Sequence, residues 1–377
     1  MLASDIMKTK KKFAASIVAV WLIILGSGFC SPAAGSVSTF AKWEAIGRVA
    51  ATQALEMITK ADVIPSKDKL IVLTNAGFAE ADGEATSGAL DGLAAVTGAS
   101  RGRSSLLEIH SAPWSPLWFA LYDKSSGFCT YLEVDPSEAA KIPQGKTEIP
   151  QRLFRLAATE RIDAEYLYQH SAEYQTKFES KIFGGNAFRI ITIANAVAAS
   201  APQGVVRAFE FHDHYCPGVI SGIFMARYLK EHFPPGKSGY FVHTVDPWCK
   251  EDALLVLLNT TPGKRSYAVS YPTADDRVGR IPEAKNASTI VYRQNRQTSR
   301  WEGLVLGFTW VETSCPKIGN ALIEKLCADL WYLDRMEKPE DFVKVIKRFE
   351  LPDGISPRDW ARPGIDPLQM LGLAKGE

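Results

Sequence analysis

The sequence predicts an α+β protein made of two similar halves, each a mixed or antiparallel sheet with helices packed on it, followed by a helical C-terminal tail. Two observations lead to this prediction. Segments with helical spacing of apolar residues alternate with short runs of β-branched and aromatic residues. The order helix, strand, helix, turn, strands also occurs twice along the chain, which indicates two copies of one domain.

The composition is that of a globular protein and excludes several classes. Of the 377 residues, 46% are hydrophobic and 23% are charged, which is unlike a disordered or coiled-coil protein. The 43 Lys and Arg residues balance the 42 Asp and Glu residues, so no basic excess indicates a nucleic-acid partner. Six cysteines in this length do not make a disulfide scaffold.

Residues 1–35 are predicted to be a secretory signal peptide. Basic residues at 8–12 precede an apolar stretch over 13–29, and small residues follow up to position 36, which is the order found in signal peptides. Cleavage within 33–36 predicts a periplasmic or extracellular protein. Two alternatives stay open: the apolar stretch is an uncleaved membrane anchor, or Cys30 is lipidated.

The first half, residues 40–150, and the second half, residues 205–312, have matching patterns. The first half is expected to contain helices over 43–59 and 89–97 and strands over 70–74, 106–109, 117–122 and 128–134. The second half is expected to contain helices over 219–233 and 253–258 and strands over 240–245, 267–271, 289–293 and 301–311.

The other two segments are expected to be mainly helical. Residues 151–204 are interpreted as a connector with helices over 160–179 and 188–199. Residues 313–377 are interpreted as a tail with helices over 318–330 and 339–349 and an extended segment over 352–367.

Some residues recur at corresponding positions of the two halves. Gly102-Arg103 corresponds to Gly263-Lys264, and at the same offset Leu90–Leu93 corresponds to Glu251–Leu254. We interpret this recurrence as a degenerate internal duplication. The alternative is that two α+β domains share a common order of elements by chance.

The segment Phe211–Gly218 carries the main chemical signal. His212, His214 and Cys216 alternate, and alternate side chains of an extended segment share a face, so both imidazoles and the thiol are expected to converge. Pro217 suits the first position of a helix, which makes Cys216 its N-cap. The positive end of the helix dipole then lowers the pKa of the Cys216 thiol and favours the thiolate.

Cys249 lies in a similar setting, between a predicted strand and the helix that follows. Two cysteines at helix N-termini and two histidines make a tetrahedral ligand set for zinc or another divalent transition metal. A disulfide between Cys216 and Cys249 is the alternative. Asp213 is expected to point away from the histidines beside it. Three carboxylates are candidates either to orient the rings or to cap helices: Asp213, Asp246 and Asp252.

The other cysteines are expected to be buried thiols. Cys129 lies in a strand pattern of the first half, and Cys315 and Cys327 flank a helix of the tail. Pairing of Cys315 with Cys327 is the alternative. Cleavage of the signal peptide leaves five cysteines, so at least one of them is unpaired.

Residues 208–306 resemble the FmdE-like family, which takes its name from a component of formylmethanofuran dehydrogenase. The family pattern Phe-His-Gly-His-x-Cys-Pro-Gly corresponds to Phe211–Gly218, a later Cys-x-x-Asp-Ala to Cys249–Ala253, and a Thr-x-Gly-Lys turn to Thr261–Lys264. Asp213 stands where the family usually has Gly.

The resemblance implies an α+β domain that binds a metal, usually zinc, and pairs with a second such domain. The implied ligands are His212, His214, Cys216 and Cys249, and the supporting residues include Thr261 and Lys264. The first half resembles a decayed copy, with Gly88 where the second half has Cys249. An intrachain pseudo-dimer is therefore expected. The resemblance does not imply formylmethanofuran chemistry, which belongs to the tungsten and molybdenum components of that enzyme.

Three functions are consistent with these features, and whether the protein is an enzyme stays open. The first is an exported metal-binding protein that acts as a carrier, a sensor or a structural module. The second is a hydrolase-type enzyme, with a metal-activated water beside Asp213 or Asp252, or with Cys216 as nucleophile. The third is a haem or other tetrapyrrole binder. Its pocket would be lined by Phe211, Tyr215 and Trp248.

These functions imply different partners. The first and the third need a metal ion, as does the metal-dependent form of the second, and the second and third also need a small-molecule or tetrapyrrole ligand. A membrane is a partner only if the N-terminal segment stays uncleaved.

Overall fold

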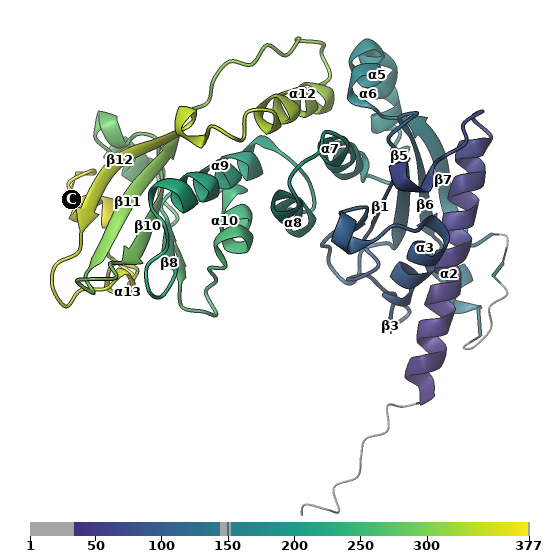
Figure 1. Ribbon diagram of the computed structural model, residues 1–377, viewed down its shortest axis with the longest axis horizontal. Coiled ribbons are helices and arrows are strands. Elements are labelled where there is room, and N and C mark those ends of the chain that lie inside the picture. Colours follow the sequence, from purple (N-terminus) through teal and green to yellow (C-terminus); the bar gives the residue numbers. More distant parts are fainter. Residues whose placement is uncertain (1–33, 144–148, 151, 376–377) are drawn as a thin grey trace, which may run out of the picture.

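The computed structural model describes residues 34–143, 149–150 and 152–375. The predicted signal peptide lies outside these residues except for its last two positions, which belong to helix α2 (Ala34–Thr59). Within the described part of the chain, no helix is long and apolar enough to cross a membrane. Two five-stranded sheets lie at a distance from each other, with helices between them and around the first (Figure 1).

The first sheet has the strand order β4-β1-β5-β6-β7. Its strands are β1 (Leu70–Thr74), β4 (Leu106–Glu108), β5 (Trp118–Asp123), β6 (Phe128–Val134) and β7 (Phe154–Arg161). Strand β1 is parallel to β4, because helix α3 (Gly88–Thr97) connects them, and the other neighbours are antiparallel. Helices α2 and α3 cover one face of this sheet around Trp43, Ile46 and Leu93.

The second sheet repeats this connectivity in the order β9-β8-β10-β11-β12. Its strands are β8 (Tyr240–Thr244), β9 (Tyr267–Val269), β10 (Ala287–Gln294), β11 (Trp301–Phe308) and β12 (Val343–Glu350). Strand β8 is parallel to β9, and the other neighbours are antiparallel. Helix α9 (Pro217–His232) precedes β8, and α10 (Lys250–Leu258) connects β8 to β9.

The helix pairs α2/α3 and α9/α10 also touch at matching glycines. A Cβ atom on Gly47 would lie 2.2 Å from the carbonyl oxygen of Ala89, and a Cβ atom on Gly222 would lie 2.4 Å from that of Lys250. Only glycine allows two helix backbones to come this close. The shared strand order and the shared helix contact are what an internal duplication predicts.

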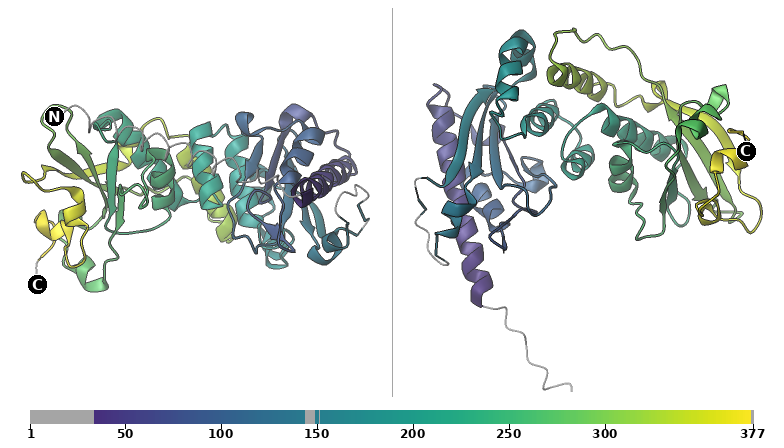
Figure 2. Two further views of the ribbon diagram at one scale, coloured as in Figure 1. Left: turned by 90° about the horizontal axis from the view of Figure 1, so that it is seen from below. Right: turned by 180° about the vertical axis from the view of Figure 1, so that it is seen from behind.

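The two helix pairs do not face each other. Helices α2 and α3 lie on the side of the first sheet that points away from the second half, whereas α9 and α10 lie between the sheets (Figure 1). Helices α7 (Ala187–Ala198) and α8 (Gln203–His212) occupy the same interior region, as the view from behind also shows (Figure 2). One hydrophobic core runs from the first sheet through these helices to the second sheet. The two halves therefore meet around α7 of the connector and α8, which begins the second half.

Two segments expected to be helical are partly strands. Strand β7 takes up the start of the connector, so its first helices are α5 (Ala164–Gln169) and α6 (Ser171–Glu179). The helix expected over 339–349 is instead a short 3-10 turn followed by β12. Charged and apolar residues alternate along part of β12, as in a strand with one buried face. This segment pairs with β11, so pairing with the sheet makes it a strand and not a helix.

The C-terminal region differs from expectation in two further ways. Cys315 and Cys327, which lies on α12 (Ala321–Leu333), form a disulfide, so the prediction of two free thiols is wrong. Their Cα atoms are 5.8 Å apart, a separation that a disulfide spans. The segment expected to be extended contains α13 (Pro357–Trp360), and Trp360 packs on the outer face of the second sheet.

Candidate metal centre

The histidine and cysteine motif lies in a turn between two helices. Helix α8 ends at His212, Asp213 adopts a left-handed conformation with φ 70°, and Cys216 is the N-cap of α9. The expectation of an extended segment is therefore wrong, although the side chains do converge. Nε2 of His212 lies 3.8 Å from Sγ of Cys216, and ligand atoms of His212, His214 and Cys216 lie within 4.8 Å of one another.

Cys249 is the N-cap of α10 and reaches this group through the contact between α9 and α10. Its side chain packs on Gly218, where a Cβ atom would lie 2.7 Å from the Cβ of Cys249. Its thiol interacts with Cys216 and with the ring of His212, but the group whose ligand atoms all lie within 4.8 Å of one another comprises His212, His214 and Cys216 and does not include Cys249. Cys216 and Cys249 are both free, so the alternative of a disulfide between them is not realised.

A carboxylate holds each imidazole ring. Oδ2 of Asp252 lies 2.7 Å from Nδ1 of His212, and Oδ1 of Asp213 lies 2.6 Å from Nδ1 of His214. Such carboxylate–histidine pairs fix the ring and leave Nε2 for a metal. Asp213 and Asp252 therefore orient the rings, and Asp213 does not point away from the histidines as expected.

The other supporting residues lie outside this cluster. Asp246 forms an ion pair with Arg277 at 2.9 Å. Just before α10, the backbone N–H of Trp248 donates to Oε2 of Glu251 at 2.5 Å. Thr261 and Lys264 form the turn before β9, in which the N–H of Lys264 donates to Oγ1 of Thr261 at 3.2 Å.

Neighbouring groups of this cluster carry opposite charges. Burial lowers the pKa of His212, but hydrogen bonds with Asp252 and Cys249 outweigh burial and raise this pKa to about 9. Hydrogen bonds with Cys216 and His212 lower the pKa of Cys249 to about 4. The hydrogen bond with Cys249, together with burial, raises the pKa of Cys216 far above its ordinary value. The thiolate therefore forms on Cys249, not on Cys216 as the helix dipole alone predicts.

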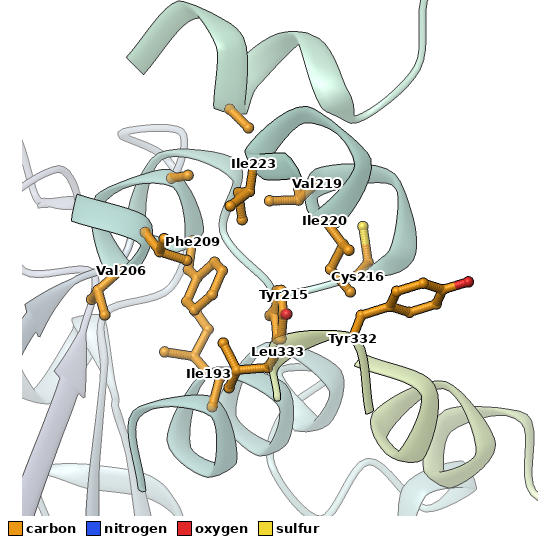
Figure 3. Close-up of a cluster of buried hydrophobic side chains, with 14 of the residues drawn as sticks. Ile193, Val206, Phe209, Tyr215, Cys216, Val219, Ile220, Ile223, Tyr332 and Leu333 are labelled. Atoms are coloured by element: carbon orange, nitrogen blue, oxygen red, sulfur yellow. The ribbon is translucent and has the colours of Figure 1, made fainter. Parts of the chain in front are cut away.

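The aromatic residues near the centre do not form one flat pocket. Tyr215 is fully buried in the apolar cluster that also contains the aliphatic face of α9 (Figure 3). Phe211 stacks on His110 of the first half, with ring centroids 5.3 Å apart. Trp248 packs edge-on against Trp310 and is 57% exposed. The tetrapyrrole pocket expected from these three residues is therefore not formed.

Glu210 anchors α8 to the first half of the chain. Its carboxylate accepts two hydrogen bonds from Arg101, at 2.9 and 3.3 Å, and one from the N–H of Glu108 at 3.0 Å. Its backbone oxygen accepts the N–H of His110 at 2.8 Å. The last turn of α8, which ends at His212, is thereby held in place. No local pattern marks these contacts, because Arg101 is 109 residues from Glu210 in the sequence.

Arg189 on α7 is a second residue that the sequence does not mark. Its Nη2 donates to Oδ2 of Asp213 at 2.8 Å. Burial raises the pKa of Asp213, but hydrogen bonds with His214 and Arg189 outweigh burial and hold this pKa below its ordinary value. Asp213 is therefore ionised between a candidate ligand and a guanidinium.

Residues 211–313 match the protein family described as FmdE, Molybdenum formylmethanofuran dehydrogenase operon. This segment is an FmdE domain. It begins at the end of α8, contains α9, α10 and the strands β8 to β11, and includes all four candidate ligands. Strand β12, which completes the second sheet, lies beyond the match. No curated protein matches the chain.

Proposed function

We propose that this is an exported metal-binding protein whose FmdE domain holds one zinc ion, or another divalent transition metal, as a carrier, a sensor or a structural module. The proposed ligands are Nε2 of His212 and His214 and Sγ of Cys216 and Cys249. The observation that carries the proposal is that each imidazole is paired with a carboxylate at Nδ1, at 2.7 Å and 2.6 Å, which leaves both Nε2 atoms for a metal.

The donor set fits the proposed ion. Two imidazoles and two thiols are the donors that zinc takes in tetrahedral sites. Four protein ligands leave the metal no open position, so this arrangement favours binding over catalysis. A metal here would join the end of α8 to the starts of α9 and α10, which these residues occupy. The metal ion would neutralise the negative charges of the two thiolates.

Two features support export. The N-terminal sequence has the order of basic, apolar and small residues that signal peptides have. The disulfide between Cys315 and Cys327 is typical of an oxidising compartment. In such a compartment a bound metal would protect the neighbouring free thiols, Cys216 and Cys249, from oxidation.

A hydrolase-type enzyme is the second candidate, and a cleft beside the centre favours it. The cleft has a volume of about 400 Å³ and Asp213 lines it. An open metal position would require that one of the four candidate ligands does not bind. Asp213 and Asp252 both accept from imidazole rings, so neither is a free general base in this arrangement.

Elemental analysis and a visible spectrum of the purified protein test the proposal. We expect about one zinc per chain, no Soret band, and thiolate-to-metal bands after substitution with cobalt(II). The double variant Cys216→Ser/Cys249→Ser should lose the metal, whereas Cys129→Ala, which removes a buried thiol of the first half, should keep it.

Three outcomes would overturn this assignment. Full metal content in the double variant would place the site elsewhere. A Soret band would favour the tetrapyrrole hypothesis. Hydrolytic activity that requires zinc and is lost in the double variant would favour the enzyme.

A further inference from the structure

The cleft beside Asp213 lies where the two halves of the chain meet. Loops that follow β1 and β4, together with β5 and β6, form its wall on the first half. Helix α7, the turn before it and the turn after α8 form the facing wall. Its polar lining includes Asn75, Ser111, Ser115, Asn186, Arg189 and Asp213.

Arg189 supplies a permanent positive charge to this cleft. Its Nη2 donates to Oδ2 of Asp213 at 2.8 Å, and its Nη1 donates to Oδ1 of Asn186 at 3.2 Å. A guanidinium has five N–H donors in a planar fork that matches the oxygens of a carboxylate or a phosphate. The side chain is 39% exposed, so further donors of Arg189 remain for a ligand.

The carboxylates of the cleft already have cationic or hydroxyl partners. Glu133 forms an ion pair with Arg155 and accepts the hydroxyl of Tyr131 at 2.6 Å. Asp213 is paired with Arg189. The described lining therefore carries no carboxylate that lacks a partner, and an oxyanion would not meet an uncompensated negative charge. Apolar surface for the rest of a small ligand comes from Ile109, Pro116 and Trp118.

The backbone conformation of Asp213 indicates that its carboxylate has a specific role at this position. Its φ of 70° is left-handed, a conformation that glycine adopts at lower cost. The FmdE-like pattern has Gly at this position, so a glycine would fit the backbone here. The aspartate instead bridges Arg189 and His214 through its two oxygens. It thus connects the cleft to a candidate metal ligand.

We propose that this cleft binds a small oxyanion, a carboxylate or a phosphate, through Arg189, and that Asp213 couples its occupancy to His214. An anion on Arg189 competes with Asp213 for the guanidinium, so the hydrogen bond of Asp213 to the His214 ring changes when the cleft is filled. The coupling rests on the proposed metal centre. The binding does not, because its donors lie on α7.

Calorimetric titration of the full chain with inorganic phosphate and with malonate tests the binding. Malonamide, which has the same shape without the charge, is the neutral control. We expect one of the two anions to bind and malonamide not to bind, and the anion that binds identifies the kind of ligand. Arg189→Met should weaken binding about 10-fold or more, and Arg189→Lys should restore part of it. Arg300→Met, which removes an exposed ion pair with Asp353, should bind like the parent protein.

A cobalt(II) spectrum recorded with and without the anion tests the coupling. In the parent protein the metal bands should shift when the anion binds. In Asp213→Gly the anion should still bind, because Arg189 then no longer pairs with a carboxylate, but the shift should disappear. Circular dichroism and metal content of each variant show whether it is folded and loaded.

Each negative result contradicts a different part of the proposals. No binding of either anion at about 10 mM, or equal binding by Arg189→Met, overturns the cleft proposal. Anion binding by a protein that takes up no metal supports the cleft and contradicts the proposed function. A loaded protein that binds the anion without a spectral shift contradicts the coupling alone.

Discussion

Asp252 and His212 meet across the contact between α10 and α8, with Oδ2 of the carboxylate 2.7 Å from Nδ1 of the ring. Asp252 lies on the first turn of α10, the helix that has Cys249 as its N-cap. The same helix start therefore supplies one candidate ligand and the carboxylate that orients another. Any shift of α10 relative to α8 would disturb both at once.

Asp252→Asn should weaken metal binding while leaving the fold intact. Loss of the carboxylate removes the charge that fixes the His212 ring, and losses of this kind cost about 10–100-fold in metal affinity. Competition with a chelator of known affinity measures the change. Asp246→Asn is the matched control, because Asp246 also lies near α10 but pairs with Arg277. Equal affinity in both variants would contradict the assigned role of Asp252.

Metal binding at pH 7 should release about two protons. His212, with a pKa of about 9, and Cys216, with a raised pKa, both hold a proton in the metal-free protein, whereas Cys249, with a pKa of about 4, does not. Ligation needs the imidazole neutral and the thiol ionised, so both protons leave. Calorimetry in buffers of different ionisation enthalpy counts them. Release of one proton would show that either His212 or Cys216 is not a ligand, and release of none would show that neither is.

The stability of the metal-free protein should depend on pH in a defined window. The pKa of His212 is raised to about 9, so its contribution is complete below pH 6.5 and is lost as the pH rises through about 9. The pKa of Cys249 is lowered to about 4, so its contribution is present above pH 9 and is lost as the pH falls through about 4. Between pH 6.5 and 9 the contributions of His212 and Cys249 to the free energy of unfolding change in opposite directions. Below pH 6.5 only the contribution of Cys249 still changes, and it decreases as the pH falls.

Urea unfolding at each pH measures this profile. The free energy of unfolding should be nearly constant between pH 6.5 and 9 and should fall from pH 6.5 towards pH 4. Cys249→Ser removes the thiolate, so the fall should be shallower in that variant. An identical fall in both proteins would assign the acid sensitivity to other groups.

Gly218→Ala should disturb the metal centre by crowding Cys249. The added Cβ would lie 2.7 Å from the Cβ and 3.1 Å from the Sγ of Cys249. Overpacking of this kind costs about 1–3 kcal/mol, and here it also displaces a candidate ligand. Gly204→Ala, on α8, is the control, because a Cβ there meets nothing within 4 Å. Thermal unfolding and metal affinity should both drop in Gly218→Ala, and neither should drop in the control.

Arg101→Met should weaken metal binding from the other half of the chain. It removes two hydrogen bonds to the buried carboxylate of Glu210, leaving the Arg207 pair and one N–H. A cost of about 1–3 kcal/mol in unfolding free energy is expected, with a several-fold loss of metal affinity, because the last turn of α8 is loosened. Unchanged metal affinity at reduced stability would show that α8 does not need this anchor.

Local features of the chain determined most of the elements and the identity of the candidate ligands. The spacing of apolar residues predicts α2, α7, α9 and most strands, since helix and strand periods are local properties. The motifs around His212, Cys216 and Cys249 indicate the FmdE domain, which the family match over 211–313 confirms. That these residues bind a metal stays a prediction.

Only the tertiary structure decided how these elements are joined. Strand β12 forms because the edge of β11 is free to pair with it, and Cys315 pairs with Cys327 because the chain returns to α12. The roles of Asp213 and Glu210 depend on Arg189 and Arg101, which approach from other elements. A short sequence pattern records which side chains are available and how they are spaced along a helix or strand. It does not record which distant groups meet them, because packing of the whole chain sets those contacts.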